Sequence, residues 1–202
     1  MLERFLRSYH VHEGRPGRVP VVGGLPSKVA AALGGCSFES GLYRVFGVEE
    51  VAGRTELAAA AFPEFAGRIQ CFGMDWLGRQ FATDSARGSK ADPEVLLLEP
   101  GTGEALEIPV SLSKFHDEEL VDYSDAVLAV ESFQDWLNRA GRAPSMDECV
   151  GYRTPLYLGG ADDITNLEIY DVDVYWTISA QLLAQTRGLP VGTPTTNVII
   201  TE

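Results

Sequence analysis

Two pairs of β-prone runs follow each other in the middle of the chain, and they constrain the fold more than any other feature. In the first pair, residues 68–76 and 79–84 flank a tight connection that contains Gly78. In the second pair, residues 94–100 and 104–110 are joined by the sequence Gly-Thr-Gly. Short glycine-containing connections between such runs are typical of β-hairpins. The pattern therefore predicts an antiparallel meander of strands that are neighbours in sequence.

Helical patterns lie on both sides of this predicted sheet. A short helix is expected to begin at Pro26 and to end before residues 34–35, which are both glycine. Apolar residues at helical spacing predict a longer helix over about residues 124–140. Asp171 is expected to cap a largely buried last helix that ends near Gly188. Shorter elements are expected as a strand at 42–46, a helix from Arg54 and a strand at 166–172.

These elements predict an α+β fold, with a mainly antiparallel sheet flanked by helices in a single compact domain. A chain of 202 residues can bury a core without disulfides or metals. Residues 1–25 contain a run rich in Pro, Gly and Arg, and we expect them to be an irregular lead-in. The domain is expected to cover residues 26–190, and residues 191–202 are expected to form a tail.

Composition favours a cytoplasmic protein. No apolar run approaches the roughly 20 residues of a membrane-spanning helix, and the N-terminal sequence does not resemble a secretory signal. The three cysteines, Cys36, Cys71 and Cys149, are far apart in sequence and odd in number, which predicts free buried thiols in a reducing compartment.

The net charge of -13 is concentrated in one region of the sequence. Between Asp117 and Asp173 there are 14 acidic residues, opposed by only three arginines. An acidic surface repels phosphate backbones and anionic lipids and attracts basic partners. We therefore expect neither direct nucleic-acid binding nor membrane binding.

Motifs for catalysis or metal binding are absent from the sequence. It has no nucleophile elbow, phosphate-binding loop or dinucleotide fingerprint. His10 and His12 would point to one side of a strand, a geometry that can bind a metal, but a lone pair of histidines is a weak pattern and a flexible terminal segment is the favoured interpretation. His116 precedes three acids and is expected to be a solvated surface residue. Asp162 and Asp163 lack the spacing of a calcium loop. We expect no catalytic residues, no metal and no cofactor.

Large aromatic residues are expected to form the core, although they would also suit the lining of a ligand pocket. They are Trp76, Phe81, Trp136, Tyr175 and Trp176.

Two segments carry a family resemblance. Residues 72–84, FGMDWLGRQFATD, and residues 155–182, PLYLGGADDITNLEIYDVDVYWTISAQL, resemble immunity proteins that protect bacteria from type VI secretion DNase effectors. The chain also resembles the broader SUKH (Smi/Knr-like) immunity superfamily. The likeness spans about residues 25–187, and most of its motif residues are structural. The matching residues are Asp75, Trp76, Gly78, Leu158, Gly159, Gly160, Asn166, Leu167, Tyr175 and Trp176.

The resemblance implies a GAD-like part over about residues 26–115 and a C-terminal part over about 116–190. It also implies a non-catalytic protein of bacterial competition that binds a cognate toxin, expected to be a basic nuclease, and occludes the toxin's basic surface. The candidate partner-binding acids are Asp117, Glu118, Glu119, Asp122, Asp162, Asp163 and Glu168. The alternative for these acids is that they only keep the protein soluble.

Two other functions remain open at this stage. In one, the protein is a non-catalytic regulatory module that binds a small molecule or peptide in a groove lined by its aromatic residues. In the other, it is a hydrolase or metal-dependent enzyme that uses His116 with nearby acids.

Overall fold

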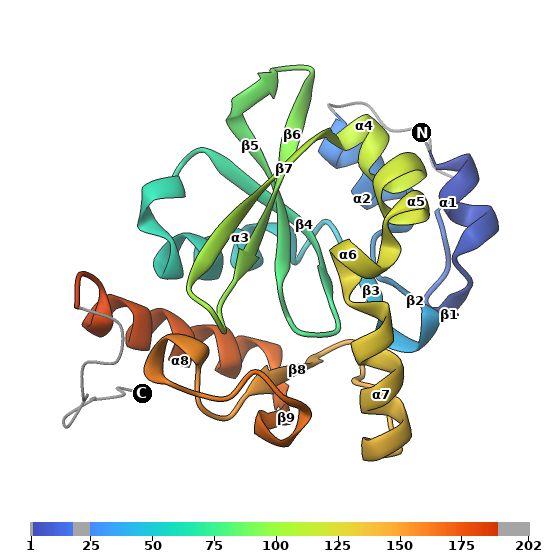
Figure 1. The fold of residues 1–202 in the computed structure, drawn as a ribbon. Helices are drawn as coiled ribbons and strands as arrows, with labels where there is room; N and C mark the ends of the chain where they lie inside the picture. Colours follow the sequence, from blue (N-terminus) through green and yellow to red (C-terminus); the bar gives the residue numbers. More distant parts are fainter. Residues whose placement is uncertain (1, 18–24, 190–202) are drawn as a thin grey trace.

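A seven-stranded antiparallel sheet runs through the computed structural model, which describes residues 2–17 and 25–189. Its strands lie side by side in the order in which they occur in the chain (Figure 1). The predicted meander is therefore confirmed, and it continues beyond the two hairpins. The strands are β1 (Val11–Glu13), β2 (Cys36–Phe38), β3 (Tyr43–Val45), β4 (Ile69–Asp75), β5 (Gln80–Ser89), β6 (Asp92–Glu99) and β7 (Glu104–Ser111).

Successive side chains on the central strands point to opposite faces of the sheet, and both faces are buried. On β5 and β6, Phe81 and Leu97 are partners on one face, while Ala82 and Leu96 are partners on the other. The register of β4 and β5 shifts at Phe72, which is an extra residue on β4 between two paired positions. Both faces are apolar, so both require a covering layer.

The first face is covered by α1, α2 and the helical segments between residues 112 and 140 (Figure 1). Trp76, Phe115 and Phe133 are buried in this layer. Its elements are α1 (Glu3–Ser8), α2 (Leu25–Leu33), α4 (Leu112–Lys114), a π-helix (Phe115–Glu119), α5 (Leu120–Asp122), α6 (Ser124–Leu128) and α7 (Val130–Ala140).

The second face is covered by α3 (Val51–Ala61) and α8 (Val172–Thr186), which pack against each other. Trp176 on α8 is buried in this layer. A separate two-stranded sheet, β8 (Glu148–Tyr152) and β9 (Leu167–Asp171), precedes α8. Short 3-10 turns complete the described chain at Glu39–Gly41, Pro63–Phe65, Leu156–Leu158 and Ile164–Asn166. The α+β fold with an antiparallel sheet flanked by helices is confirmed.

The expectation of an irregular lead-in is wrong for residues 3–13, which form α1 and β1. Phe5 on α1 is fully buried and stacks on Tyr9 with a ring-centroid distance of 4.6 Å. The helix is held by a residue far away in sequence, because the Asp117 carboxylate accepts a hydrogen bond from the Phe5 backbone N–H at 3.1 Å. Residues 18–24 and the expected tail at 191–202 lie outside the described residues.

The expected single helix over 124–140 is divided into α6 and α7 at Ala129, which has a left-handed conformation with φ of 51°. The Asp125 carboxylate accepts a hydrogen bond from the Glu131 backbone N–H at 2.9 Å, which caps the start of α7. The Trp76 indole N–H donates to the Leu128 carbonyl at 2.9 Å, which satisfies an acceptor at the end of α6. One local and one tertiary hydrogen bond thus stabilise the break, although the helical spacing of apolar residues continues through it.

Replacing either fully buried tryptophan, by Trp76→Ala or Trp176→Ala, is expected to lower the free energy of unfolding by about 3–5 kcal/mol. Each change leaves a cavity and removes an indole hydrogen bond. Urea denaturation measures the effect. The matched control is Tyr123→Ala, because Tyr123 is 61% exposed and its loss should change stability by about 0.5 kcal/mol or less. Two tryptophan variants as stable as the control would contradict this description of the core.

Candidate functional site

A cleft of about 620 Å³ opens where the β4–β5 hairpin turn, α7 and the β8–β9 sheet meet. Its walls combine apolar groups from Leu77, Ile164 and Leu167 with charged and polar groups from both helix and loops. The charged residues of the lining are Arg79, Glu99, Asp135, Arg139, Asp162 and Asp163. This composition suits recognition of a polar or charged group better than a purely apolar ligand.

The floor of the cleft is set by the hairpin turn. The buried Asp75 carboxylate accepts hydrogen bonds from the backbone N–H groups of Leu77 and Arg79, both at 3.0 Å. It also accepts one from Nε of the Arg79 side chain at 2.6 Å. The guanidinium of Arg79 further donates to the Val127 carbonyl at 2.8 Å. The Arg79 side chain is therefore fixed in place, and the buried Asp75 carboxylate compensates its charge.

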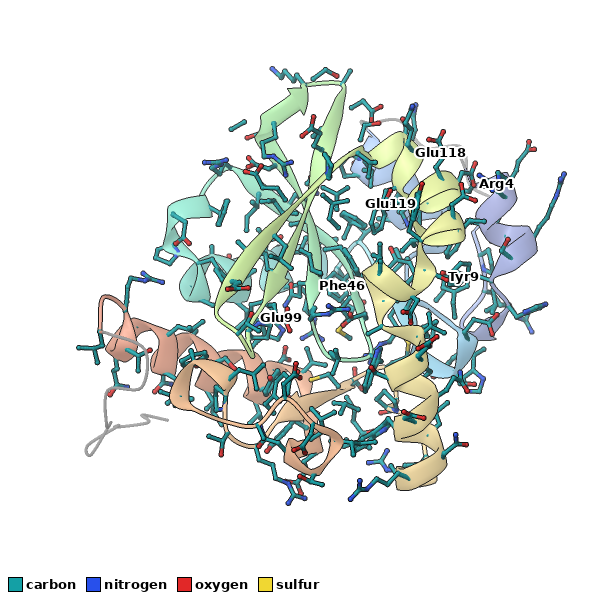
Figure 2. All side chains as sticks on the ribbon, in the orientation of Figure 1. Arg4, Tyr9, Phe46, Glu99, Glu118 and Glu119 are labelled. Carbon is teal, nitrogen blue, oxygen red and sulfur yellow. The ribbon has the colours of Figure 1, made fainter. Side chains whose placement is uncertain are left out.

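Glu99 lies at the end of β6 (Figure 2) and lines the cleft together with Arg79. The register places Gln80 opposite Leu98, so the next positions along the two strands, Arg79 and Glu99, are neighbours. Glu99 is only 9% exposed, yet within residues 2–17 and 25–189 its carboxylate forms neither a hydrogen bond nor an ion pair. Burial raises the pKa of Glu99, and the nearby positive charge of Arg79 opposes this rise.

Two of the predicted partner-binding acids lie at this cleft. Asp162 accepts a hydrogen bond from the Tyr152 hydroxyl at 2.7 Å. Asp163 accepts one from the Thr165 backbone N–H at 2.7 Å and so caps the 3-10 turn at Ile164–Asn166. Their carboxylates are thus oriented by the loop that carries them. The third acid of this group, Glu168, is exposed on β9 and forms an ion pair with Arg153 at 3.2 Å.

The other four predicted acids lie on the π-helix and α5, at the opposite end of the α4–α7 helices from the cleft (Figures 1 and 2). Asp122 binds the Arg4 guanidinium with both oxygens, at 3.0 and 2.6 Å. Glu118 lies 3.7 Å from the Lys114 ammonium. Asp117 holds α1, as described above, and Glu119 is half-buried. The structure therefore divides the seven acids between two regions, and their role in binding stays a prediction.

The residues of the family resemblance connect the hairpin turn to the C-terminal segment. The Trp176 indole N–H donates to the Gly78 carbonyl at 2.8 Å, and the Tyr175 hydroxyl accepts from the Tyr152 backbone N–H at 3.3 Å. A side chain at Gly78 would collide with Cys149, because a Cβ there would lie 2.8 Å from its Sγ.

The side-chain amide of Asn166 helps to hold the loop that contains Leu158, Gly159 and Gly160. Asn166 Oδ1 accepts from the Thr154 backbone N–H at 3.0 Å, and Nδ2 donates to the Thr154 carbonyl at 2.8 Å. A Cβ at Gly160 would lie 1.9 Å from the same carbonyl oxygen, so only glycine fits there. Leu158 and Leu167 are half-buried beside this loop. The structural interpretation of the motif agrees with these contacts.

The expectation that His116 is a solvated surface residue is wrong. The side chain is fully buried among Phe5, Phe72 and Phe115, and its Nε2 lies 3.0 Å from the Tyr43 hydroxyl. The π-helix turns this residue inward, which charge patterning along the sequence does not reveal. Burial lowers the pKa of His116 to about 3. The histidine does not line the cleft, so the arrangement required by the hydrolase hypothesis is not found among the described residues.

The remaining candidates for chemistry are reactive thiols and metal ligands. All three cysteines are free and buried, as expected, and burial raises the pKa of Cys71 and of Cys149 to about 12. His10 forms a hydrogen bond with Glu39 at 2.9 Å, while His12 is exposed on β1. The described part of the chain has no cluster of three or more His, Cys, Asp or Glu residues that could hold a metal ion.

Sequence reasoning missed the cleft and its central carboxylate. A signal was present, because Val95, Leu97 and Glu99 alternate on one face of β6, and Val95 and Leu97 are in the core. A charged residue in the third such position indicates a site where the core opens to solvent or to a ligand. Asp135 and Arg139 could not be assigned in the same way, since their position depends on the break at Ala129.

Two of three comparisons with known proteins give a match. Residues 113–183 match the family model described as "T6SS immunity protein Tdi1, C-terminal". A comparison with curated proteins gives no match. Among solved structures, the crystal structure of Atu4351 from Agrobacterium tumefaciens is similar with a TM-score of 0.56 and 16% sequence identity. This match covers 90% of this chain and 89% of that chain, and it supports the fold alone. None of the helices in residues 2–17 and 25–189 is both long and apolar enough to span a membrane.

Stability should depend on pH through His116. Between pH 7 and pH 5 the unfolded chain binds a proton at this histidine that the folded protein excludes, so acidification favours unfolding by about 2 kcal/mol over this interval. Urea denaturation at both pH values should show this loss of unfolding free energy in the Tyr43→Phe variant. This variant keeps His116 and lacks its hydroxyl partner, so it differs from the double variant below only at residue 116. The double variant Tyr43→Phe/His116→Phe should lose about 2 kcal/mol less. Equal pH dependence of the two variants would show that His116 is accessible to protons in the folded state.

Proposed function

We propose that this chain is an immunity protein of a type VI secretion system, which binds a cognate toxin and neutralises it without catalysing a reaction. The observation that carries the proposal is the family match over residues 113–183. This range includes the acids of the π-helix and α5 and the cleft residues on α7, β8, β9 and the loop before β9. The hairpin turn and the end of β6, which also line the cleft, lie outside the range. The proposal extends to a nuclease as the toxin, to action in the cytoplasm and to a relation with SUKH immunity proteins.

Charge supports a nuclease as the partner. A DNase must attract a polyanion and therefore has a basic substrate-binding surface. The regional excess of acids between Asp117 and Asp173 complements such a surface. A protein that covers this surface excludes DNA and gains electrostatic acceleration of encounter. Neutralisation of this kind requires complementary patches and no reactive group.

A second function, the small-molecule or peptide-binding regulatory module, is favoured by the cleft beside the hairpin turn. The cleft is not the aromatic groove that this hypothesis requires, because Trp76 is fully buried and much of the lining is charged. A ligand there would be recognised mainly by its charge. Thermal denaturation with and without cellular metabolite extract would reveal a stabilising small molecule if this function holds.

Neutralisation is tested with the cognate effector, which is to be sought as a secreted nuclease encoded by a neighbouring gene. Co-expression of the two proteins should restore growth to cells that the effector alone kills, and an equimolar amount of this protein should stop DNA cleavage by the purified effector. An effector that cleaves DNA at the same rate in a stable complex would disprove occlusion of its active surface. Absence of any complex would reject the proposed function.

The role of the acidic residues is tested by charge-neutral variants that leave the fold intact. Glu118→Gln/Glu119→Gln, or Asp162→Asn/Asp163→Asn, should lower the association rate with the effector by about threefold or more at low ionic strength and change the dissociation rate less. Asp117 is left unchanged because it holds α1.

The control for these rates is Glu13→Gln/Glu64→Gln, which removes two charges from exposed positions outside the seven predicted acids. Stopped-flow measurements at several salt concentrations compare the variants. If the control and the two test variants slow association equally, only net charge matters and the acids form no specific face.

A further inference from the structure

We infer that the cleft beside Glu99 receives one basic side chain of the bound toxin, an arginine in preference to a lysine, and that the Glu99 carboxylate is its ion-pair partner. This inference rests on the proposed function and names the chemistry by which the partner is anchored. It assigns to the cleft a role that is separate from the exposed acids on the π-helix and α5.

The first argument is the unsatisfied state of Glu99. Glu99 is only 9% exposed, and the carboxylate of such a residue normally has a hydrogen-bonding or ionic partner, because desolvation of an unpaired charge is costly. Nothing in the described part of the chain supplies one to Glu99, although the side chain lines an open cleft. An incoming cation would recover the lost solvation. A residue that lowers stability in the free protein and gains a partner on binding is typical of a functional site.

The second argument is that Arg79 does not occupy this role. Its Nε donates to Asp75 at 2.6 Å and its Nη2 donates to the Val127 carbonyl at 2.8 Å. Asp75 is fully buried and neutralises Arg79 from the side away from the cleft. With this pair compensated, the remaining acids at the cleft are Glu99, Asp135, Asp162 and Asp163, and they are opposed only by Arg139. The cleft is therefore negative.

The third argument is the kind of cation that the lining suits. Carboxylates reach the cleft from β6, from α7 and from the loop before β9, so acceptors lie on several sides. A guanidinium has five N–H donors in a planar fork and meets several acceptors at once, whereas an ammonium is a point charge. The apolar groups of Leu77, Ile164 and Leu167 can pack against the methylene stem of a long side chain. A bare metal ion is less suitable, since the described residues place no three ligands together.

The chemistry of the cleft is tested without the toxin by using capped tripeptides as probes. Acetyl-Gly-Arg-Gly-amide should shift the backbone NMR resonances of residues at the cleft at low ionic strength. The lysine peptide should bind more weakly, and the citrulline peptide, which has the same shape without charge, should not bind. Equal shifts from the arginine and citrulline peptides would overturn the inference.

The matched variants are Glu99→Gln, which removes the charge and keeps the shape, and Glu64→Gln, which removes an exposed charge outside the cleft. Glu99→Gln should weaken binding of the arginine peptide at least about tenfold, while Glu64→Gln should leave it unchanged. Urea denaturation checks folding, and Glu99→Gln should be at least as stable as the natural chain because it removes an unpaired buried charge. Asp135→Asn, at the exposed wall of the cleft, supplies an independent loss of affinity should Glu99→Gln fail to fold.

The same variants with the effector distinguish this inference from the proposed function. Glu99→Gln should raise the dissociation rate of the complex at least about tenfold and change the association rate little, because a buried contact forms after encounter. If the natural chain neutralises the effector and Glu99→Gln dissociates at the same rate, the inference is wrong and the proposed function stands. If the natural chain does not bind the effector, the proposed function is wrong. The inference that the cleft receives an arginine of the toxin is then wrong as well.

Discussion

The buried carboxylate of Asp75 organises the turn on which the cleft and both covering layers depend. It shapes residues 76–79 through two backbone N–H groups and holds the Arg79 side chain. Two side chains of the turn then donate hydrogen bonds to the end of α6, the Arg79 guanidinium to the Val127 carbonyl and the Trp76 indole to the Leu128 carbonyl. Breaking this pair would leave a charge buried without compensation, which is far more destabilising than the pair itself is stabilising. Burial raises the pKa of Asp75, and Arg79 acts against that rise.

The C-terminal segment is attached to the same turn and to a second buried charge. The Val150 backbone N–H donates to the Trp76 carbonyl at 2.8 Å, which places β8 beside the hairpin. Arg44 on β3 is fully buried, and its guanidinium donates to main-chain carbonyls of Ser145, Met146, Glu148 and Asp75. Burial lowers the pKa of Arg44 to about 10. A guanidinium that binds carbonyl groups fixes an otherwise irregular segment, so the position of β8 depends on the first sheet.

Local signals in the sequence predict the sheet well, because each hairpin is determined by alternation and by a short turn. The same signals fail where a partner distant in sequence decides the outcome. The start of α1 depends on Asp117, and the break at Ala129 depends on Trp76 as well as on nearby Asp125. Two short strands, β2 and β8, have too few residues to show a period. At the site, the acids of the loop before β9 were identified by composition, whereas Glu99 required knowledge of which face of β6 is buried.

The exposed acids and the buried Glu99 have two different physical roles. Exposed carboxylates on the π-helix and α5 already contact cations of their own chain, as Asp122 contacts Arg4, so each has little remaining capacity for a tight contact with a partner. Their summed field still acts over a Debye length and increases the rate of encounter. The cleft contributes differently, because a desolvated carboxylate interacts strongly only with a group that enters it. A complex built in this way would owe its rate of formation to the exposed acids of both regions and its lifetime to the buried carboxylate of Glu99 in the cleft.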